Sequence, residues 1–332
     1  MRKPLLFVGL FTASIVFGQD IHFSTYTQFE QEENPAFMGA MSGLYRAKIF
    51  YRNQWSVVPV PYITTGLTVD GRFFPSRQQN AWLGGGLTVY KDAAGDLKLS
   101  ENYIGLAGAV MLGVSNTTFI GAGLSFSYSW YSIDLANAKG ISQWDGFQYD
   151  PNVPLGEGPI GTYSTPNLSV GVGAMYNIEV FRLAVGLALH NLIGARNAFY
   201  GNEVRAKRIV AHLRSYVELN KQWAIVPFVF SAYQNPFFEL TLGGLVRYDI
   251  NPNASFVHGV SAGLAYRTRD AIAPIIRYEF RSIDITVAYD LITSTLKQDI
   301  GSMAGGPEVT LSVMYPFEGS RKGYGKIYCP RF

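Results

Sequence analysis

Most of this chain consists of segments in which apolar residues occupy every second position and the intervening residues are small, polar or charged. The stretch from Ile120 to Trp130 shows the pattern most clearly, with Ile, Ala, Leu, Phe, Tyr and Trp on one parity and only Gly and Ser on the other. Side chains of a β-strand point alternately to two sides, so this pattern predicts a strand with one apolar and one polar face. Whether the apolar face meets a protein core or lipid is left open.

Segments with this alternation recur along the chain and predict about fourteen strands. Clear segments lie at 63–69, 83–89, 104–112, 120–130, 168–176, 181–189, 238–248, 283–291 and 309–315, and weaker ones at 44–54, 208–219, 223–231, 258–266 and 272–280. A chain reversal at residues 178 and 179 would place Tyr176 opposite Phe181, on the same face. A reversal at residues 281 and 282 matches apolar residues in the same way. Consecutive strands are therefore expected to form an antiparallel up-and-down meander.

The parity opposite the apolar one carries many charged residues. They are Arg46, Lys48, Arg52, Asp70, Arg72, Arg182, His190, His212, Arg214, Glu218, Glu239, Arg247, Asp249, Arg277, Glu279, Asp284 and Asp290. The dry centre of a closed soluble barrel cannot hold them, because burying charge costs several kcal/mol per ion. A soluble sandwich remains possible, but its outer surface should carry more Lys and Glu. A transmembrane β-barrel of the outer-membrane type accounts for both faces, with lipid outside and a polar interior.

Residues 1–18 have the layout of a secretory signal peptide, with cleavage expected near Gly18 or Gln19. Two basic residues precede an apolar run from Leu5 to Phe17. The alternative, an N-terminal membrane anchor, is disfavoured because the run is shorter than the roughly 20 residues that span a bilayer. The sequence after it contains no apolar run long enough for a spanning helix.

Loop lengths test the barrel topology independently. With the N-terminus in the periplasm, connections from odd to even strands should be long and those from even to odd strands short. The first group comprises KDAAGDLKLSE and residues 132–165, 193–207 and 293–306; the second comprises FPSRQQN, VSNTT, NIEV, NKQ and RS. Only the short YQNP link and the longer link near Asn251 depart from this order.

Composition and motifs exclude several kinds of function. The net charge is only +3 and Lys and Arg are scattered, so nucleic acid is not expected as a partner. The one cysteine, Cys329, has no intrachain partner and no assigned role. LGGGLTV and VGVGAM lack the helix and Lys-Ser/Thr of a phosphate loop, and DAAGD at 92–96 lacks the ligands of a calcium loop. We expect no metal and no cofactor.

An outer-membrane lipase would need a nucleophilic Ser beside a His base. Only His190, His212 and His258 lie in predicted strands, and no local signature pairs a Ser with any of them. We therefore expect that the protein is not an enzyme.

Two features of the sequence indicate that another molecule or another segment of the chain packs against the predicted barrel. The long connection between residues 132 and 165 mixes Trp144, Phe147, Tyr149 and Tyr163 with Gly and Pro. Exposed aromatic residues are common interface anchors, so these four form a candidate partner-binding loop, although packing within the loop explains them equally well. The Gly and Ser face of 120–130 also leaves space at the wall, which a folded-in loop, the N-terminal segment or cargo could occupy.

The region after the signal peptide resembles the PorP/SprF family of type IX secretion system outer-membrane proteins from Bacteroidetes. The matching residues are Gln19-Asp20, His22-Phe23-Ser24, Asn34-Pro35-Ala36-Phe37 with Gly39, and Tyr51-Arg52-Asn53-Gln54-Trp55. Weaker matches are HNLI at 190–193, YRTRDA at 266–271, AYDLITSTL at 288–296 and the terminal CPRF. Pro307-Glu308 departs from the His-Glu pair expected there.

The resemblance implies a barrel that helps export or retain type IX substrates, such as large gliding adhesins, by binding their C-terminal sorting domain. Other secretion components and the lipid bilayer are the further partners it implies. From the residues alone, Asn34–Phe37 could equally be a Pro-set turn into the first strand, and Arg52–Trp55 an interfacial strand end. The alternative function is a passive outer-membrane channel or small-solute transporter.

These inferences divide the chain into four parts. We expect a signal peptide at 1–18, a periplasmic N-terminal segment at 19–42, the transmembrane barrel at 43–316 and a C-terminal tail at 317–332. The expected location is the outer membrane, with both termini in the periplasm.

Overall fold

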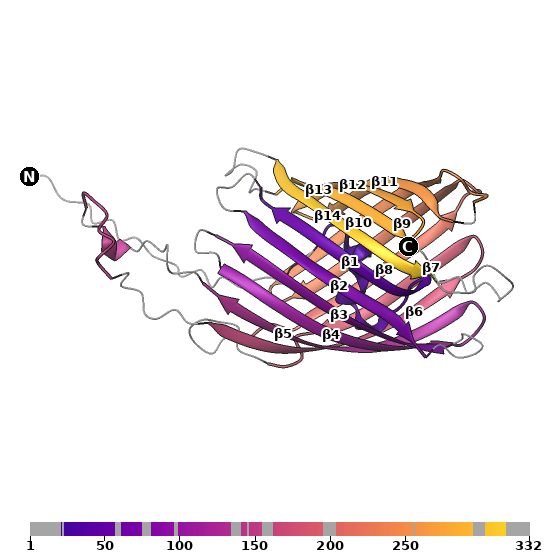
Figure 1. The fold of residues 1–332 in the computed structure, drawn as a ribbon, viewed down its shortest axis with the longest axis horizontal. Helices are drawn as coiled ribbons and strands as arrows, with labels where there is room; N and C mark the ends of the chain where they lie inside the picture. Colours follow the sequence, from indigo (N-terminus) through magenta and orange to yellow (C-terminus); the bar gives the residue numbers. More distant parts are fainter. Residues whose placement is uncertain are drawn as a thin grey trace, which may run out of the picture.

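Fourteen antiparallel strands form one closed barrel, as the alternation predicts (Figure 1). The computed structural model describes residues 21, 23–56, 61–74, 81–95, 99–133, 141–144, 146–154, 162–194, 204–254, 256–294 and 303–316. The strands are β1 (Gly43–Gln54), β2 (Tyr62–Phe73), β3 (Ala81–Ala94), β4 (Leu99–Gly113), β5 (Thr118–Ser132), β6 (Tyr163–Asn177), β7 (Phe181–His190), β8 (Arg208–Glu218), β9 (Trp223–Gln234), β10 (Phe237–Asp249), β11 (His258–Arg267), β12 (Ala271–Phe280), β13 (Ile283–Ile292) and β14 (Ala304–Pro316). Each strand pairs with its neighbours in sequence, and β1 closes the barrel against β14.

Short helices accompany the strands. The segment before β1 contains η1 (Tyr26–Gln28), α1 (Glu30–Glu33) and η2 (Pro35–Phe37), and η3 (Ile141–Gln143) lies between β5 and β6. None of the helices in the described residues is long and apolar enough to cross a membrane.

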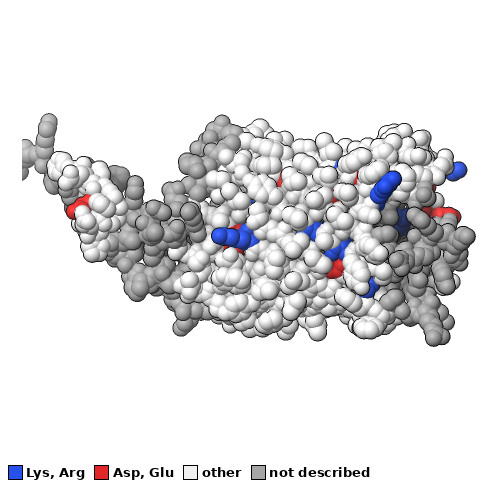
Figure 2. All heavy atoms as spheres, in the orientation of Figure 1, with Lys and Arg blue, Asp and Glu red and all other residues white. Residues whose placement is uncertain are grey.

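The two faces of the wall differ as the sequence predicts. In β5, every even-numbered residue from Ile120 to Trp130 is exposed on the outside, whereas the odd-numbered Gly and Ser residues face inward and are buried or half-buried. Figure 2 shows few charged side chains over the broad outer wall. Backbone polar groups in lipid must be paired internally, and the closed ladder of hydrogen bonds meets that need.

The hairpin at β12 and β13 has the predicted register, with Phe280 opposite Ile283. The predicted register of β6 and β7 is wrong by two residues, because Tyr176 lies opposite Leu183 and not Phe181. Ile178 and Phe181 exchange backbone hydrogen bonds of 2.8 and 3.3 Å, which places the turn at residues 179 and 180. A shift of two residues leaves every side chain on its predicted face, so alternation alone cannot detect it.

One predicted long loop is mostly strand. Within KDAAGDLKLSE, residues 91–94 continue β3 and residues 99–101 begin β4, with Asp92 opposite Glu101. A backbone ladder needs no apolar side chains, so it continues where the alternation fades. The longest connections, residues 133–162 and 191–207, both follow odd-numbered strands. We call the rim that carries them the long-loop rim and the opposite one the short-turn rim.

Residues 23–42, here called the lumen segment, cross the interior of the barrel. Ser24 contacts Asp290 and Glu308 near the long-loop rim, whereas Gly43, where β1 begins, lies opposite Pro316 at the short-turn rim. The sequence predicted a periplasmic segment here, but its described residues lie among lumen-facing side chains. The described N-terminal end and the end of β14 therefore lie at opposite rims.

The two faces of β5 predict opposite tolerance to charge. Leu124 is 60% exposed on the lipid side, and Ser125 faces inward next to it. We expect Leu124→Arg to lower the free energy of unfolding by about 2–4 kcal/mol and Ser125→Arg to cost much less. A folding titration into lipid vesicles measures both, and equal losses would contradict the assigned faces.

Candidate functional site

The lumen segment places the Asn34–Phe37 motif against a patch of glycines on the inner wall. Gly121, Gly173 and Gly186 form a row across β5, β6 and β7, and Gly123 pairs with Gly171 in the next row. A Cβ on Gly173 would come within 2.5 Å of the Phe37 ring, and one on Gly123 would collide with the Pro35 carbonyl. Gly123 thus makes room for the backbone of the turn, and Gly171, Gly173 and Gly186 make room for the side chains of Asn34 and Phe37.

Asn34 links this turn to three strands. Its side-chain Nδ2 donates to the carbonyl oxygens of Val172 (3.1 Å) and Leu187 (3.3 Å) and lies 3.2 Å from Nε2 of His212. Its Oδ1 accepts from the backbone N–H of Ala36 at 3.0 Å, which caps η2. Asn34 is completely buried, and a buried amide that satisfies both ends of its side chain in this way specifies one position for the segment.

Phe37 continues the contact through apolar packing. It belongs to a buried cluster with Trp82, Met111, Phe119 and Met175 from the inner wall, and its ring centroid lies 5.1 Å from that of His212. The turn then passes through Gly39, which has φ of +72° and sits so close to β2 and β3 that a Cβ would lie 2.7 Å from the carbonyl oxygen of Gly71. Only glycine meets both conditions at little cost.

Arg72 and Asp70 fasten the end of the turn. The backbone N–H of Gly39 donates to Asp70 at 3.0 Å, and Arg72 Nε donates to the Gly39 carbonyl at 2.8 Å. The Arg72 guanidinium also lies 4.0 Å from the centroid of the Trp82 ring, a cation–π contact.

A second anchor holds the start of the segment near the long-loop rim. The backbone N–H groups of Ser24 and Thr25 donate to the Glu308 carboxylate at 2.9 and 3.0 Å. Arg52 lies 3.8 Å from Glu308 and 3.4 Å from Asp290, and Arg267 donates to Asp290 at 2.9 Å. Glu308 belongs to the Pro-Glu pair that departs from the family pattern, yet here it binds the backbone of the lumen segment.

Glu33 forms a third anchor, just before the motif. Its carboxylate accepts from Arg208 at 2.8 Å, and its carbonyl oxygen lies 2.9 Å from Nε2 of His190. His190 Nδ1 lies 3.0 Å from the Ser169 hydroxyl. Two of the three strand histidines therefore contact the lumen segment.

Lys48 and Glu32 hold the middle of the segment. Lys48 donates to the carbonyl oxygen of Gln28, and Glu32 accepts hydrogen bonds from the hydroxyls of Thr68 (2.7 Å) and Thr88 (2.9 Å). Within the described residues, no group of His, Cys, Asp and Glu is arranged to hold a metal ion.

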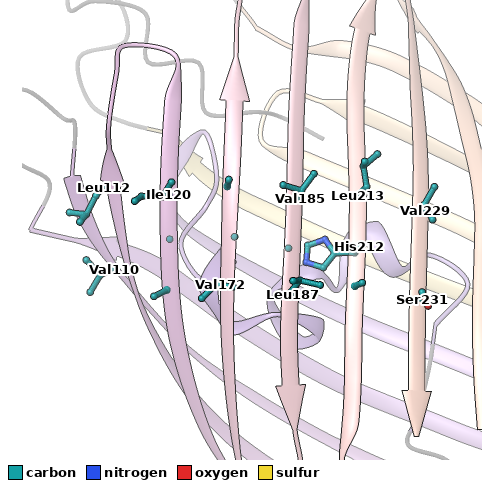
Figure 3. A pocket seen from close by; sticks show the side chains of 16 residues that line it. Val110, Leu112, Ile120, Val172, Val185, Leu187, His212, Leu213, Val229 and Ser231 are labelled. Carbon is teal, nitrogen blue, oxygen red and sulfur yellow. The ribbon is translucent and has the colours of Figure 1, made fainter.

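On the lipid side, the same glycine row underlies an apolar pocket of about 850 Å³. Its walls come from outward-facing residues of β4 to β9, among them Val110, Ile120, Val172 and Leu187, and Figure 3 shows these side chains around it. Gly121, Gly173, Gly186 and His212 also line it. The wall between this pocket and the Asn34–Phe37 turn is therefore only one strand backbone thick.

The second predicted motif, Tyr51–Trp55, does not form one site. Tyr51 faces outward, whereas Arg52 is buried in the lumen with Glu308 and Asp290. Trp55 follows the end of β1 with φ of +56° and its ring packs edge-on against Tyr62, with centroids 5.2 Å apart. Asn53 and Gln54 are the last two residues of β1 and are half-buried.

The predicted partner-binding aromatics separate into two places. Trp144 and Tyr149 form a β-bridge, and Phe147 between them is 93% exposed. Tyr163 is instead the first residue of β6, where its ring stacks on Tyr131 at 4.4 Å. The loop candidate therefore reduces to Trp144, Phe147 and Tyr149.

Some predicted features lie outside the described residues. These are the signal peptide with Gly18 and Gln19, His22, and the C-terminal tail with Cys329. The glycine patch, Glu33 and Glu308 were not predicted as site residues. The glycines at inward-facing positions of β5 and β6 were the sequence signal that another segment packs closely against this wall.

Comparisons with known proteins agree with this geometry. A family model described as type IX secretion system membrane protein PorP/SprF matches residues 15–313. Among solved structures, a Pseudomonas aeruginosa FadL homologue is similar at a TM-score of 0.50 with 12% identity, covering 86% of this chain and 93% of its own. The CymD monoaromatic hydrocarbon channel is similar at 0.50 with 13% identity, covering 87% and 93%. No curated protein matches significantly.

The glycine patch predicts a specific effect of added side chains. Gly123→Val puts a side chain into the Pro35 backbone, so we expect a loss of about 1–3 kcal/mol in stability and displacement of the motif from the wall. Gly108→Val on the neighbouring strand is the matched control, because its nearest atom is 3.9 Å from the added Cβ. Limited proteolysis of the lumen segment and thermal unfolding in detergent measure the two effects; similar results for both variants would contradict the close contact.

Proposed function

The chain belongs to the PorP/SprF family of type IX secretion system membrane proteins, and we propose that it assists export or surface retention of specific secreted proteins by binding their C-terminal sorting domain. The cargo class we infer is the large surface adhesin, and the protein acts together with other secretion components. It acts by binding and has no catalytic role in this proposal.

The observation that carries the proposal is the lumen segment. Its side chains from Ser24 to Met41 are mostly buried, and three anchors fasten it to inward-facing residues on both sides of the barrel. Because the lumen segment occupies the interior, we expect partners to bind at the ends of the barrel and not inside it. Binding sites on rigid scaffolds are commonly carried by loops.

The described part of the connection between β5 and β6, residues 141–144 and 146–154, offers one such surface and stands away from the barrel wall (Figure 1). Trp144 is 55% and Phe147 93% exposed, and the segment beneath them is ordered by its own contacts. The Gln143 side-chain Nε2 donates to the carbonyl oxygen of Val153 at 2.8 Å, and the backbone N–H of Asp150 donates to the carbonyl oxygen of Gln143 at 2.8 Å. Exposed aromatics held on an ordered turn lose little conformational entropy on binding, which suits them as anchors.

We expect loss of these anchors to weaken cargo binding. Trp144→Ala with Phe147→Ala should cost about 2 kcal/mol or more, roughly a 30-fold loss of affinity. The measurement is co-purification, from native membranes in mild detergent, of secreted proteins that carry the sorting domain. Phe74→Ala is the control, because Phe74 is an aromatic residue, 83% exposed, at the opposite rim. Undiminished recovery with the double variant would count against this binding surface.

The alternative, a passive channel or small-solute transporter, makes a different prediction in planar bilayers. We expect low conductance from the protein as it stands, because the lumen segment crosses the interior. Asn34→Ala removes the side chain that bonds to β6 and β7, so it should make open events more frequent. Large, stable pores formed by the unaltered protein would favour the channel.

A further inference from the structure

Two adjacent cavities lie at the short-turn rim, on the side of the lumen segment away from the long loops. The larger, of about 510 Å³, is lined by Arg182, Lys221 and Arg247 among others, together with residues of the turn at 250–257. The smaller, of about 70 Å³, lies between the lumen segment and the turn at 281–282. Arg247 of the first forms an ion pair with Glu279 of the second, so the two cavities are neighbours, and we call them together the basic mouth.

Positive charge is concentrated in the basic mouth. Its lining contains eight Lys and Arg side chains against four Asp and Glu side chains, and Asp70, which pairs with Arg46 just outside the lining, is a fifth carboxylate. The whole chain has a net charge of only +3, so this lining carries an excess as large as that of the entire protein. Such a concave region of one sign attracts and concentrates ligands of the opposite charge.

The cations of the basic mouth belong to the lumen and not to the lipid-facing wall. Arg46, Arg214 and Arg277 occupy inward positions of β1, β8 and β12 and are mostly buried, whereas the outward neighbours Tyr45, Leu213 and Ile276 are exposed. Lipid headgroups surround the outside of a barrel, so they do not reach these side chains. The ligand must enter through the open end of the barrel.

The cations are also held in position. Arg277 donates to Asp284 at 2.7 Å and Arg247 to Asp249 at 2.7 Å, and Arg46 forms a two-pronged pair with Asp70 at 2.9 and 2.8 Å. Fixed cations lose less entropy when they bind than mobile ones do.

Two further cations of the basic mouth donate to backbone carbonyl oxygens of the lumen segment. Arg214 donates to the carbonyl oxygen of Thr27 at 3.0 Å, and Lys48 donates to that of Gln28.

We propose that the basic mouth binds an acidic segment of a second protein. The cations come from five strands and two turns, so a single small anion would meet only a few of them, whereas Asp and Glu side chains along an extended peptide can meet many. Short turns mark the periplasmic side of bacterial barrels, which makes the occupant a periplasmic protein. This inference goes beyond cargo binding at the long-loop rim and does not depend on it.

The test is binding of a fluorescent oligoglutamate peptide to the full-length protein in neutral detergent. We expect saturable binding that weakens when salt is raised to about 0.5 M. Lys221→Glu with Arg281→Glu changes two exposed turn residues of the basic mouth. Its lining then holds six cations and six carboxylates, so affinity for the peptide should fall about tenfold or more. The matched control, Lys91→Glu with Arg269→Glu, makes the same change in net charge at exposed positions near the long-loop rim and should leave affinity unchanged.

Several outcomes would overturn the proposal. Equal losses in the two double variants would mean attraction by overall charge alone. Displacement of the peptide by millimolar inorganic phosphate would indicate a simple anion site, and displacement by micelles containing anionic lipid would indicate headgroup binding. If the charge-reversed variant fails to fold, Lys221→Gln with Arg281→Gln replaces it, and full retention of affinity by that folded variant would equally contradict the proposal.

Discussion

Hydrogen bonds between β1 and β14 close the sheet, and the lipid-facing wall and the polar lumen both follow from this closure. In lipid, each backbone N–H and C=O must find a partner within the protein, and a sheet with free edges leaves two rows of these groups unsatisfied. Pairing of β1 with β14 removes both edges. It also determines that one parity of every strand faces lipid and the other faces a narrow interior, where charges gather because they cannot lie outside.

The interior created by closure is filled by the chain itself. The lumen segment meets small residues where its own backbone approaches the wall and charged residues where its polar groups need partners. The glycine patch and the completely buried Asn34 illustrate the first case, and Glu308 with the N–H groups of residues 24 and 25 the second. The inward charges that exclude a dry soluble core are thus largely neutralised by partners on both the wall and the segment.

Because the lumen segment fills the interior, the two ends of the barrel are the places where other molecules can bind, and they differ in chemistry. The long-loop rim presents exposed aromatic side chains, suited to a folded protein surface. The short-turn rim presents a hollow with excess positive charge, suited to a flexible acidic chain. Two such unlike surfaces would suit two different kinds of partner.

The barrel, the number of strands and the face of each strand residue could all be predicted from the sequence, because a period of two is a local property. It holds even where the predicted register of β6 and β7 is wrong by two residues. It also marked Asn34–Phe37 through resemblance to a family. The position of that motif, the glycines it contacts and the charged residues that form the anchors follow from the fold alone. Those contacts link residues as distant as Ser24 and Glu308, and no local pattern specifies which inward-facing positions meet across a closed lumen.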